Sequence, residues 1–241
     1  MPTSAESPKR IADLKRILVV DDDDEARALM RMALSLDDYE IIEAADGLAA
    51  LRLAHEMRPD LLLLDIEMPL MDGWLTCQRI REVWDTPVIM VTALSQLDAR
   101  VKGLGIGADD YVSKPWDIDE LRMRVKAVLK RATERPYLQR PMRYQDAHLT
   151  VDLATRDVVV EGEQVALTPI EFDLLSHLVQ HPNQPVTSAE LLRLIWGDEY
   201  NDAEATLRVH LHHLRRKIEP DPRRPRYLRT ERGIGYRFQT V

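Results

Sequence analysis

Short apolar runs alternate with amphipathic stretches between residues 17 and 131. The apolar runs are ILVV (17–20), EIIEA (40–44), DLLLL (60–64), PVIMV (87–91) and DYVS (110–113). Helix-like segments follow them, at about 24–36, 47–56, 73–83, 98–105 and 117–131. Continuous apolar runs are typical of strands buried on both faces. Five of them alternating with five helices predict an α/β fold with a doubly wound, five-stranded parallel sheet.

A different pattern begins after this region. Residues 132–143 (ATERPYLQRPMR) contain two prolines and three arginines without apolar periodicity, which indicates a linker. Short alternating strands are expected around 146–167, then three helices, then two β-rich segments joined by a glycine-containing turn. Capping boxes at 168–171 and 187–190 mark the starts of the first two helices. This order predicts an α+β winged helix-turn-helix domain at 144–241.

Charge is unevenly distributed along the chain. The net charge is −8, and residues 1–130 account for it, with 25 acidic and 17 basic side chains. Residues 206–237 instead hold ten basic side chains and three acidic ones. An overall pI near 5.4 argues against nucleic-acid binding, but this local concentration of positive charge reverses that argument.

Cysteine content and hydropathy predict a cytoplasmic protein without a membrane partner. Cys77 is the only cysteine, so no internal disulfide can form. No apolar run approaches the ~18–20 residues needed to cross a bilayer. The opening MPTSAESPKR lacks the apolar core of a signal peptide.

Polar side chains stand where the predicted strands of the first region end. They are Asp21 and Asp22 after the first strand, Asp65 at the third, Thr92 at the fourth and Lys114 after the fifth. Because functional groups of an open parallel sheet collect at the carboxyl ends of its strands, these side chains are expected in one crevice.

This set of side chains fits phosphoryl transfer to a carboxylate. Clustered carboxylates repel one another unless a cation lies among them, and oxygen ligands with open positions suit Mg²⁺. A lysine and a threonine hydroxyl can hold phosphoryl oxygens, which leaves Asp65 as the nucleophile. Alone, each residue has a simpler explanation as a helix-terminal charge, a strand end, a turn residue or a solvated lysine. The joint pattern favours the phosphoryl-transfer site.

Four motifs in this region resemble those of response-regulator receiver domains, which have a flavodoxin-like fold. They are VVDD (19–22), LLLLDIEMP (61–69), VIMVTA (88–93) and GADDYVSKP (107–115), within a domain at 15–131. The resemblance implies that Asp65 accepts a phosphoryl group from a sensor histidine kinase. It also implies Mg²⁺ ligation by Asp21, Asp22, Asp65 and the backbone carbonyl of Glu67, with Asp21 acting through water. Lys114, preceding a cis bond to Pro115, is implied to contact the phosphate, with Thr92 and Tyr111 as a switch pair.

The basic region contains a long amphipathic helix at about 203–219 (AEATLRVHLHHLRRKIE). Its apolar stripe consists of Leu207, Leu211, Leu214 and Ile218. Cationic side chains lie mostly elsewhere on its circumference: Arg208, His212, Arg215 and Arg216. Such a helix can lie in the DNA major groove, with Arg229 and Arg232 of the following hairpin reaching phosphates or a minor groove. The alternative is a solvated basic helix.

The segments LTPIEFDLLSHLVQHPNQPVTSAELLRLIWG (167–197), TLRVHLHHLRRKIEPDPRRPRYLRT (206–230) and RGIGYRF (232–238) resemble the OmpR/PhoB-type effector domain. The resemblance implies a recognition helix at 203–219, a wing arginine at Arg232, and binding to direct repeats roughly 10–11 bp apart. It further implies a homodimer on phosphorylation and allows RNA polymerase as a partner. The implied dimer face of the receiver contains Arg100, Asp109, Asp110, Glu120 and Arg124.

Four positions depart from the family pattern. His212 and His213 stand where two basic residues, commonly arginines, are usual, which predicts weaker or more pH-dependent DNA binding. Gly105 replaces a common glutamate of the dimer face, and Trp116 replaces the usual phenylalanine.

The sequence therefore predicts a phosphorylation-activated transcriptional regulator rather than a turnover enzyme. Two alternatives remain: a DNA-binding regulator independent of phosphorylation, and a phosphohydrolase that uses an aspartyl-phosphate.

Overall fold

The computed structural model describes residues 14–93, 107–133, 143–197 and 204–241. The helix expected at about 98–105, together with Arg100 and Gly105, lies outside these ranges, as does most of the expected linker.

The first region is a five-stranded, all-parallel sheet with the order β2-β1-β3-β4-β5. The strands are β1 (Lys15–Val20), β2 (Tyr39–Ala44), β3 (Leu61–Asp65), β4 (Val88–Thr92) and β5 (Asp110–Ser113). The helices are α1 (Asp24–Leu34), α2 (Gly47–Met57), α3 (Gly73–Arg81) and α5 (Ile118–Thr133). The predicted parallel sheet is confirmed.

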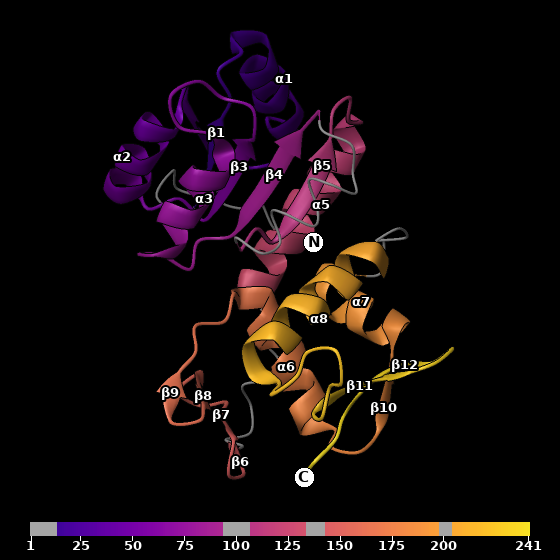
Figure 1. Ribbon diagram of the computed structural model, residues 1–241. Coiled ribbons are helices and arrows are strands. Elements are labelled where there is room, and N and C mark those ends of the chain that lie inside the picture. Colours follow the sequence, from indigo (N-terminus) through magenta and orange to yellow (C-terminus); the bar gives the residue numbers. More distant parts are fainter. Residues whose placement is uncertain (1–13, 94–106, 134–142, 198–203) are drawn as a thin grey trace, which may run out of the picture.

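Helices cover both faces of this sheet (Figure 1). Along β1, Ile17 and Val19 belong to a buried cluster with α1 and α5, whereas Leu18 and Val20 belong to a cluster with α2 and α3. Because successive side chains of a strand point to opposite faces, a strand buried on both faces must be apolar at every position. This is why the strands appear in the sequence as unbroken apolar runs.

The second region contains three helices between two small antiparallel sheets. The four-stranded sheet has β6 (Arg143–Gln145), β7 (Leu149–Asp152), β8 (Asp157–Val160) and β9 (Glu163–Gln164). The helices are α6 (Pro169–Gln180), α7 (Ser188–Trp196) and α8 (Glu204–Ile218). The three-stranded sheet, ordered β10-β12-β11, has β10 (Pro185–Thr187), β11 (Leu228–Glu231) and β12 (Gly235–Phe238).

The helix starts follow the predicted capping signals. Thr168 and Glu171 form a complete capping box at α6. At α7, the Thr187 side chain accepts a hydrogen bond from the Glu190 backbone, but the Glu190 carboxylate contacts His177 instead of returning to the cap. β10 was not predicted, because a three-residue strand becomes recognisable only through its pairing with β12.

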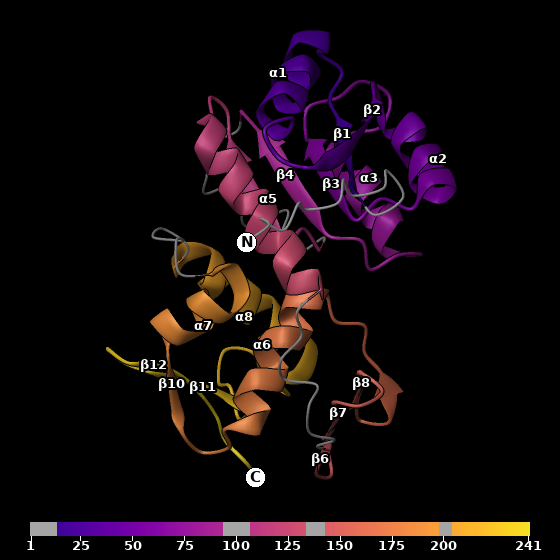
Figure 2. The same ribbon diagram turned by 180° about the vertical axis from the view of Figure 1, so that it is seen from behind.

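The two regions lie end to end (Figures 1 and 2). The C-terminal part of α5 lies against the helices of the second region, and its contacts include α7. Within the described ranges, no helix combines the length and apolar character needed to cross a bilayer.

Candidate functional site

Three aspartates meet at the carboxyl edge of the parallel sheet. Strands β1 and β3 are neighbours in register, with Val20 opposite Leu64, so the residues that follow them lie side by side. Asp21, Asp22 and Asp65 each offer a carboxylate oxygen, and these oxygens lie within 4.8 Å of one another. Asp21 and Asp65 are buried, whereas Asp22 is exposed and leaves the cluster open to solvent.

Lys114 reaches this cluster from the end of β5. Its Nζ donates to Asp21 Oδ2 at 2.7 Å and lies 3.1 Å from Asp65 Oδ1. The peptide bond between Lys114 and Pro115 is cis, as the resemblance implies. Burial disfavours the charged amine, but the hydrogen bond to Asp21 and the charge of Asp65 outweigh it and raise the pKa of Lys114. The lysine therefore carries its positive charge beside the acids.

The charged form of Asp65 remains disfavoured despite the neighbouring Lys114. Burial raises its pKa above the ordinary value of 3.8, and the nearby charge of Asp21 adds to that increase, while Lys114 opposes it. A second cation among the three carboxylates relieves this repulsion, and an all-oxygen donor set with an exposed member suits Mg²⁺. The residues present therefore fit the implied ion.

The acidic run after β1 has two separate roles. Asp21 and Asp22 belong to the carboxylate cluster, whereas Asp23 is the N-cap of α1 and accepts a hydrogen bond from the Glu25 backbone. Asp24 and Glu25 occupy the first helical turn, where the helix dipole favours negative charge. The explanation by helix capping is thus correct for the second part of the run only.

The loop after β3 is held close to Asp65. The backbone N–H of Glu67 donates to Asp65 Oδ2 at 3.1 Å, while the Glu67 side chain is exposed. Gly73 begins α3, and a Cβ at this position would lie 2.1 Å from the carbonyl oxygen of Asp65. Only glycine permits so close an approach of α3 to the phosphoacceptor candidate. The sequence predicts a helix that begins at about residue 73, but it does not predict this contact.

Thr92 and Tyr111, the implied switch pair, are both buried, at 2% and 3% exposure. Thr92 ends β4 at the carboxyl edge, and Tyr111 lies on the neighbouring β5. The Tyr111 ring points into the α2–α3 side of the core, 6.4 Å from the ring of Trp74. Burial raises the pKa of its hydroxyl well above 10.0, and this hydroxyl has no hydrogen-bond partner among the described residues.

The charged residues of the implied dimer face make contacts within the chain. Arg124 lies 3.2 Å from Asp110 and 2.6 Å from Glu120. Asp109 pairs with Arg81 and, at 2.7 Å, with Arg131. Arg100 lies outside the described residues. Pairing across a dimer therefore requires these charges to exchange partners or share them.

The outer surface of α8 carries part of the expected basic set. Arg208, His212 and Arg216 are exposed, and Arg208 pairs with Glu204 at 2.9 Å. Arg215 is half-buried and donates to the Leu228 carbonyl, so it joins α8 to the wing hairpin. His213, expected at the surface, is 8% exposed.

The wing hairpin presents the remaining two arginines. Arg229 lies on β11 and Arg232 in the turn before β12, and both are exposed. Gly233 adopts a φ of 75° in that turn, a conformation that glycine accepts without steric cost. The exposed part of the predicted basic site therefore consists of Arg208, His212, Arg216, Arg229 and Arg232.

Two family models match the two regions. Residues 17–126 match the response regulator receiver domain, and residues 162–238 match the C-terminal domain of transcriptional regulatory proteins. The chain is 39% identical to the DNA-binding dual master transcriptional regulator RpaA of Synechocystis sp., over 92% of this chain and 94% of that protein. It is also 39% identical to the transcriptional regulatory protein KdpE of Mycobacterium tuberculosis, over 92% of this chain and 98% of that protein.

Solved structures agree with this assignment. The response regulator DrrB of Thermotoga maritima, an OmpR/PhoB homologue, is 30% identical, with a TM-score of 0.50 over 94% of this chain and all of that chain. A RitR mutant is 23% identical and shares the fold, with a TM-score of 0.76 over the same fractions. The parallel sheet with its acidic edge, the winged-helix region and these relatives together show that the chain belongs to the OmpR/PhoB family of two-component response regulators with a DNA-binding domain.

Proposed function

We propose that Asp65 accepts a phosphoryl group from a sensor histidine kinase, and that phosphorylation promotes receiver pairing and sequence-specific DNA binding to regulate transcription. One observation carries this proposal: a buried Asp65 carboxylate lies beside Lys114 and the Asp21–Asp22 pair at the carboxyl edge of the sheet. The domain boundaries proposed for this function are 15–131 for the receiver, 132–143 for the linker and 144–241 for the effector.

The proposed reaction moves one phosphoryl group. A carboxylate oxygen of Asp65 forms the new bond to phosphorus, while the bond from phosphorus to the kinase histidine nitrogen breaks and its electron pair stays on that nitrogen. Lys114 Nζ, 3.1 Å from Asp65 Oδ1, can hold an oxygen of the transferred group by a charge-assisted hydrogen bond.

Asp21, Asp22, Asp65 and the backbone carbonyl of Glu67 would hold Mg²⁺ in this site. The ion supplies positive charge that neutralises phosphoryl oxygens during transfer. Asp21 already accepts hydrogen bonds from Lys114 and from the Asp23 backbone, which fix its orientation.

Tyr111 and Thr92 are proposed to report phosphorylation to the dimer face. Thr92 lies at the same sheet edge as Asp65, and Tyr111 is buried next to Asp110, whose carboxylate accepts from the Tyr111 backbone at 2.7 Å. Because Asp110 of the implied dimer face is the residue next to Tyr111, movement of Tyr111 also shifts Asp110.

DNA binding is proposed for the exposed cations of α8 and the wing. Two such effector domains tethered by a receiver dimer bind adjacent half-sites at a raised effective concentration, so affinity increases without new base contacts. Direct repeats roughly one helical turn apart suit this arrangement, and RNA polymerase is a further proposed partner.

Phosphorylation of the Asp65→Asn variant tests the phosphoacceptor. Wild type incubated with phosphoramidate and Mg²⁺ should gain one phosphoryl group, measured by intact-protein mass spectrometry, and Asp65→Asn should gain none. Asp60→Asn is the matched control, because Asp60 stands at the opposite end of β3, where it contacts Lys15 and the Arg16 backbone. Equal incorporation by wild type and Asp65→Asn contradicts the assignment.

DNA selection with and without phosphoramidate tests whether phosphorylation promotes sequence-specific DNA binding. Phosphorylated wild type should enrich a repeated motif, whereas Asp65→Asn should not respond to the phosphodonor. An equal motif and equal affinity for wild type with and without phosphodonor would support the alternative of a phosphorylation-independent regulator.

A further inference from the structure

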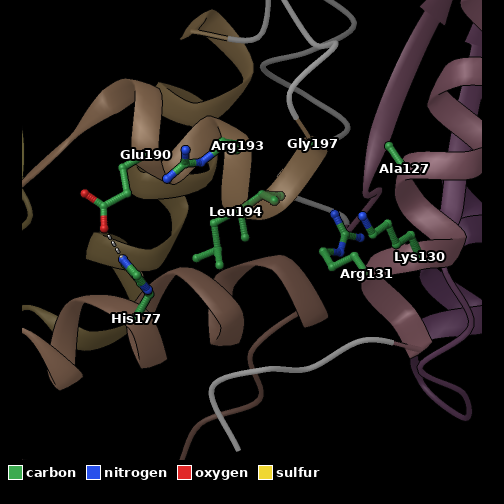
Figure 3. Close-up of a pocket in the computed structure, with 9 residues that line it drawn as sticks. Ala127, Lys130, Arg131, His177, Glu190, Arg193, Leu194 and Gly197 are labelled. Atoms are coloured by element: carbon green, nitrogen blue, oxygen red, sulfur yellow. Dashed lines mark hydrogen bonds and ion pairs between the residues drawn. The ribbon is translucent and has the colours of Figure 1, made fainter.

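A cavity of about 300 Å³ lies where α5 of the receiver meets α6 and α7 of the effector. This volume is at the lower end of the range for sites that bind small molecules. Figure 3 shows the side chains that line it, which include Ala127, Lys130 and Arg131 of α5, His177 of α6, and Glu190 and Leu194 of α7. Lys130 is exposed at the rim, so the cavity is reached from solvent.

Arg131 is held firmly at the α5 side of this cavity. Its side chain is 3% exposed, its Nη2 donates to Asp109 Oδ1 at 2.7 Å, and its Nε lies 3.9 Å from Asp173 Oδ2 of α6. These two contacts fix the position of the guanidinium. The remaining nitrogen, Nη1, is buried and has no hydrogen-bond partner among the described residues. A buried N–H without an acceptor costs free energy, so Nη1 is a donor whose acceptor a ligand can supply.

The ion pairs around this guanidinium leave an excess of positive charge. Asp109 also pairs with Arg81, and Asp173 lies 3.8 Å from Arg156. Three guanidinium groups therefore share two carboxylates in a largely buried cluster, and Lys130 adds another cation on the same side of the cavity. A phosphate monoester has up to two negative charges and three terminal oxygens, so it can accept from Nη1 and from Lys130 together. A phosphate therefore suits this side better than a single carboxylate.

The rest of the lining suits the organic part of such a ligand. Leu194 and Ala127 provide apolar surface, and in Figure 3 Leu194 lies between the α5 cations and the His177–Glu190 pair. His177 is kept uncharged by burial, which lowers its pKa, and the charges of Glu190 and Arg193 oppose each other. This side therefore has no excess charge and suits a neutral polar group. His177 Nε2 lies 3.0 Å from Glu190 Oε1, so Glu190 Oε2 can accept a hydrogen bond from a ligand.

We propose that this cavity binds a small organic phosphate of the nucleoside monophosphate class. The phosphate accepts hydrogen bonds from Arg131 Nη1 and Lys130, the nucleoside lies along Leu194, and an amine of the base donates to Glu190. Because the ligand contacts both domains at once, its binding stabilises their contact. The site shares no residue with the proposed phosphorylation site or with the exposed cations of α8 and the wing.

Isothermal titration calorimetry of the unphosphorylated full chain with adenosine monophosphate tests this site. The buffer contains EDTA, so that the phosphate cannot bind through a metal ion at Asp65. One molecule should bind per chain. Adenosine, which lacks the phosphate, and inorganic phosphate, which lacks the nucleoside, should each bind at least about tenfold more weakly.

Lys130→Gln and Lys126→Gln form a matched pair of variants on the same helix. Lys126 is also exposed, but its Nζ pairs with Asp37 of the receiver at 2.8 Å and does not line the cavity. Lys130→Gln should weaken the binding of adenosine monophosphate about tenfold, whereas Lys126→Gln should leave it unchanged.

Two further variants test the buried part of the cavity. Arg131→Gln removes Nη1 and should also weaken binding at least about tenfold. Ala127→Phe leaves every charge in place but fills the space beside Leu194, so it should weaken binding by a similar factor. Circular dichroism checks that each variant is folded. Asp65→Asn should bind as tightly as wild type, because the site does not depend on the proposed phosphorylation.

The outcomes decide between a specific site and general attraction of anions. Weaker binding in Lys130→Gln, Arg131→Gln and Ala127→Phe, but not in Lys126→Gln, supports the site. Equal affinity of wild type for adenosine monophosphate and inorganic phosphate overturns the recognition of the nucleoside, and equal affinity for adenosine overturns the phosphate contact. The absence of binding to wild type, or wild-type affinity in folded Lys130→Gln and Ala127→Phe, overturns the proposal as a whole.

Discussion

At the scale of single residues, burial separates the two neighbouring histidines of α8. His212 is exposed, whereas His213 is buried, at 8% exposure. In the sequence, both histidines stand where the family usually has two basic residues, but only His212 lies on the exposed surface. A positive charge added at His213 would be buried in the folded chain, where it costs free energy unless it is paired.

His212→Arg should therefore strengthen non-specific DNA binding by itself. The added guanidinium can neutralise one further phosphate, so the slope of log K against log salt should steepen by about 1. Titration of a labelled random-sequence duplex at several salt concentrations measures this slope. Leu48→Arg, on the exposed surface of α2 far from α8 (Figure 1), adds a comparable charge and should leave the slope unchanged. An unchanged slope in His212→Arg would show that this position does not face DNA.

At the scale of elements, one carboxylate joins the four-stranded sheet to the segment that leads into the wing. Asp146 accepts hydrogen bonds from the backbones of His148 and Leu149 and from the hydroxyls of Tyr144 and Tyr227. Burial opposes its charge, but these hydrogen bonds outweigh it and lower the pKa of Asp146 to about 2. The charged form of Asp146 is thus a tie between elements that are about 80 residues apart in the chain.

Asp146→Ala should lower the free energy of unfolding of the effector by about 2 kcal/mol, because the donors lose a charged acceptor. Since the folded state lowers this pKa, the contribution is present above pH 3.8 and is lost as the pH falls toward 2. Urea unfolding followed by tyrosine fluorescence at neutral and acidic pH measures both effects. Asp157→Ala, which removes one exposed hydrogen bond to Gln164, should change stability by less than about 0.5 kcal/mol. Equal losses in both variants would contradict this account.

At the scale of the whole molecule, the domain contact should respond to pH through His210. Burial opposes a proton on its ring, as do the charges of Arg131, His213 and Lys217, and the backbone of Asp109 favours a proton too weakly to offset them. The domain contact therefore lowers the pKa of His210, and the chain binds fewer protons with the domains in contact than with the domains apart. The domain contact therefore has its full stability above pH 6.5 and loses stability as the pH falls below that value.

The radius of gyration of the unphosphorylated chain should therefore increase between about pH 7.5 and pH 5.5. Small-angle scattering across this range measures the change. His210→Asn has no titrating ring and should remove the pH dependence. His177→Gln removes another histidine whose burial lowers its pKa, but one that lies between α6 and α7, so it should retain the dependence. A pH response that survives in His210→Asn must come from another group.

Local patterns explain why much of this architecture is readable from the sequence. Unbroken apolar runs predict strands that are buried on both faces. A carboxylate such as Asp65 at the end of such a run indicates a functional site. Thr168 and Glu171 predict the start of α6, because their capping hydrogen bonds join residues that are only three positions apart in the chain. Short-range signals of this kind depend on backbone geometry and burial, which neighbouring residues already specify.

The sequence by itself determined the parallel sheet, the acidic edge and the basic winged helix, because each depends on periodicity or on strand ends. The tertiary structure decided which charged side chains are exposed and which already form ion pairs within the chain. Asp109, Asp173 and Arg131 are far apart in the chain but lie close together in the structure, and His213 looks equivalent to His212 in the sequence although folding buries it. Packing between domains depends on surface shape and on long-range pairing, which no local pattern records.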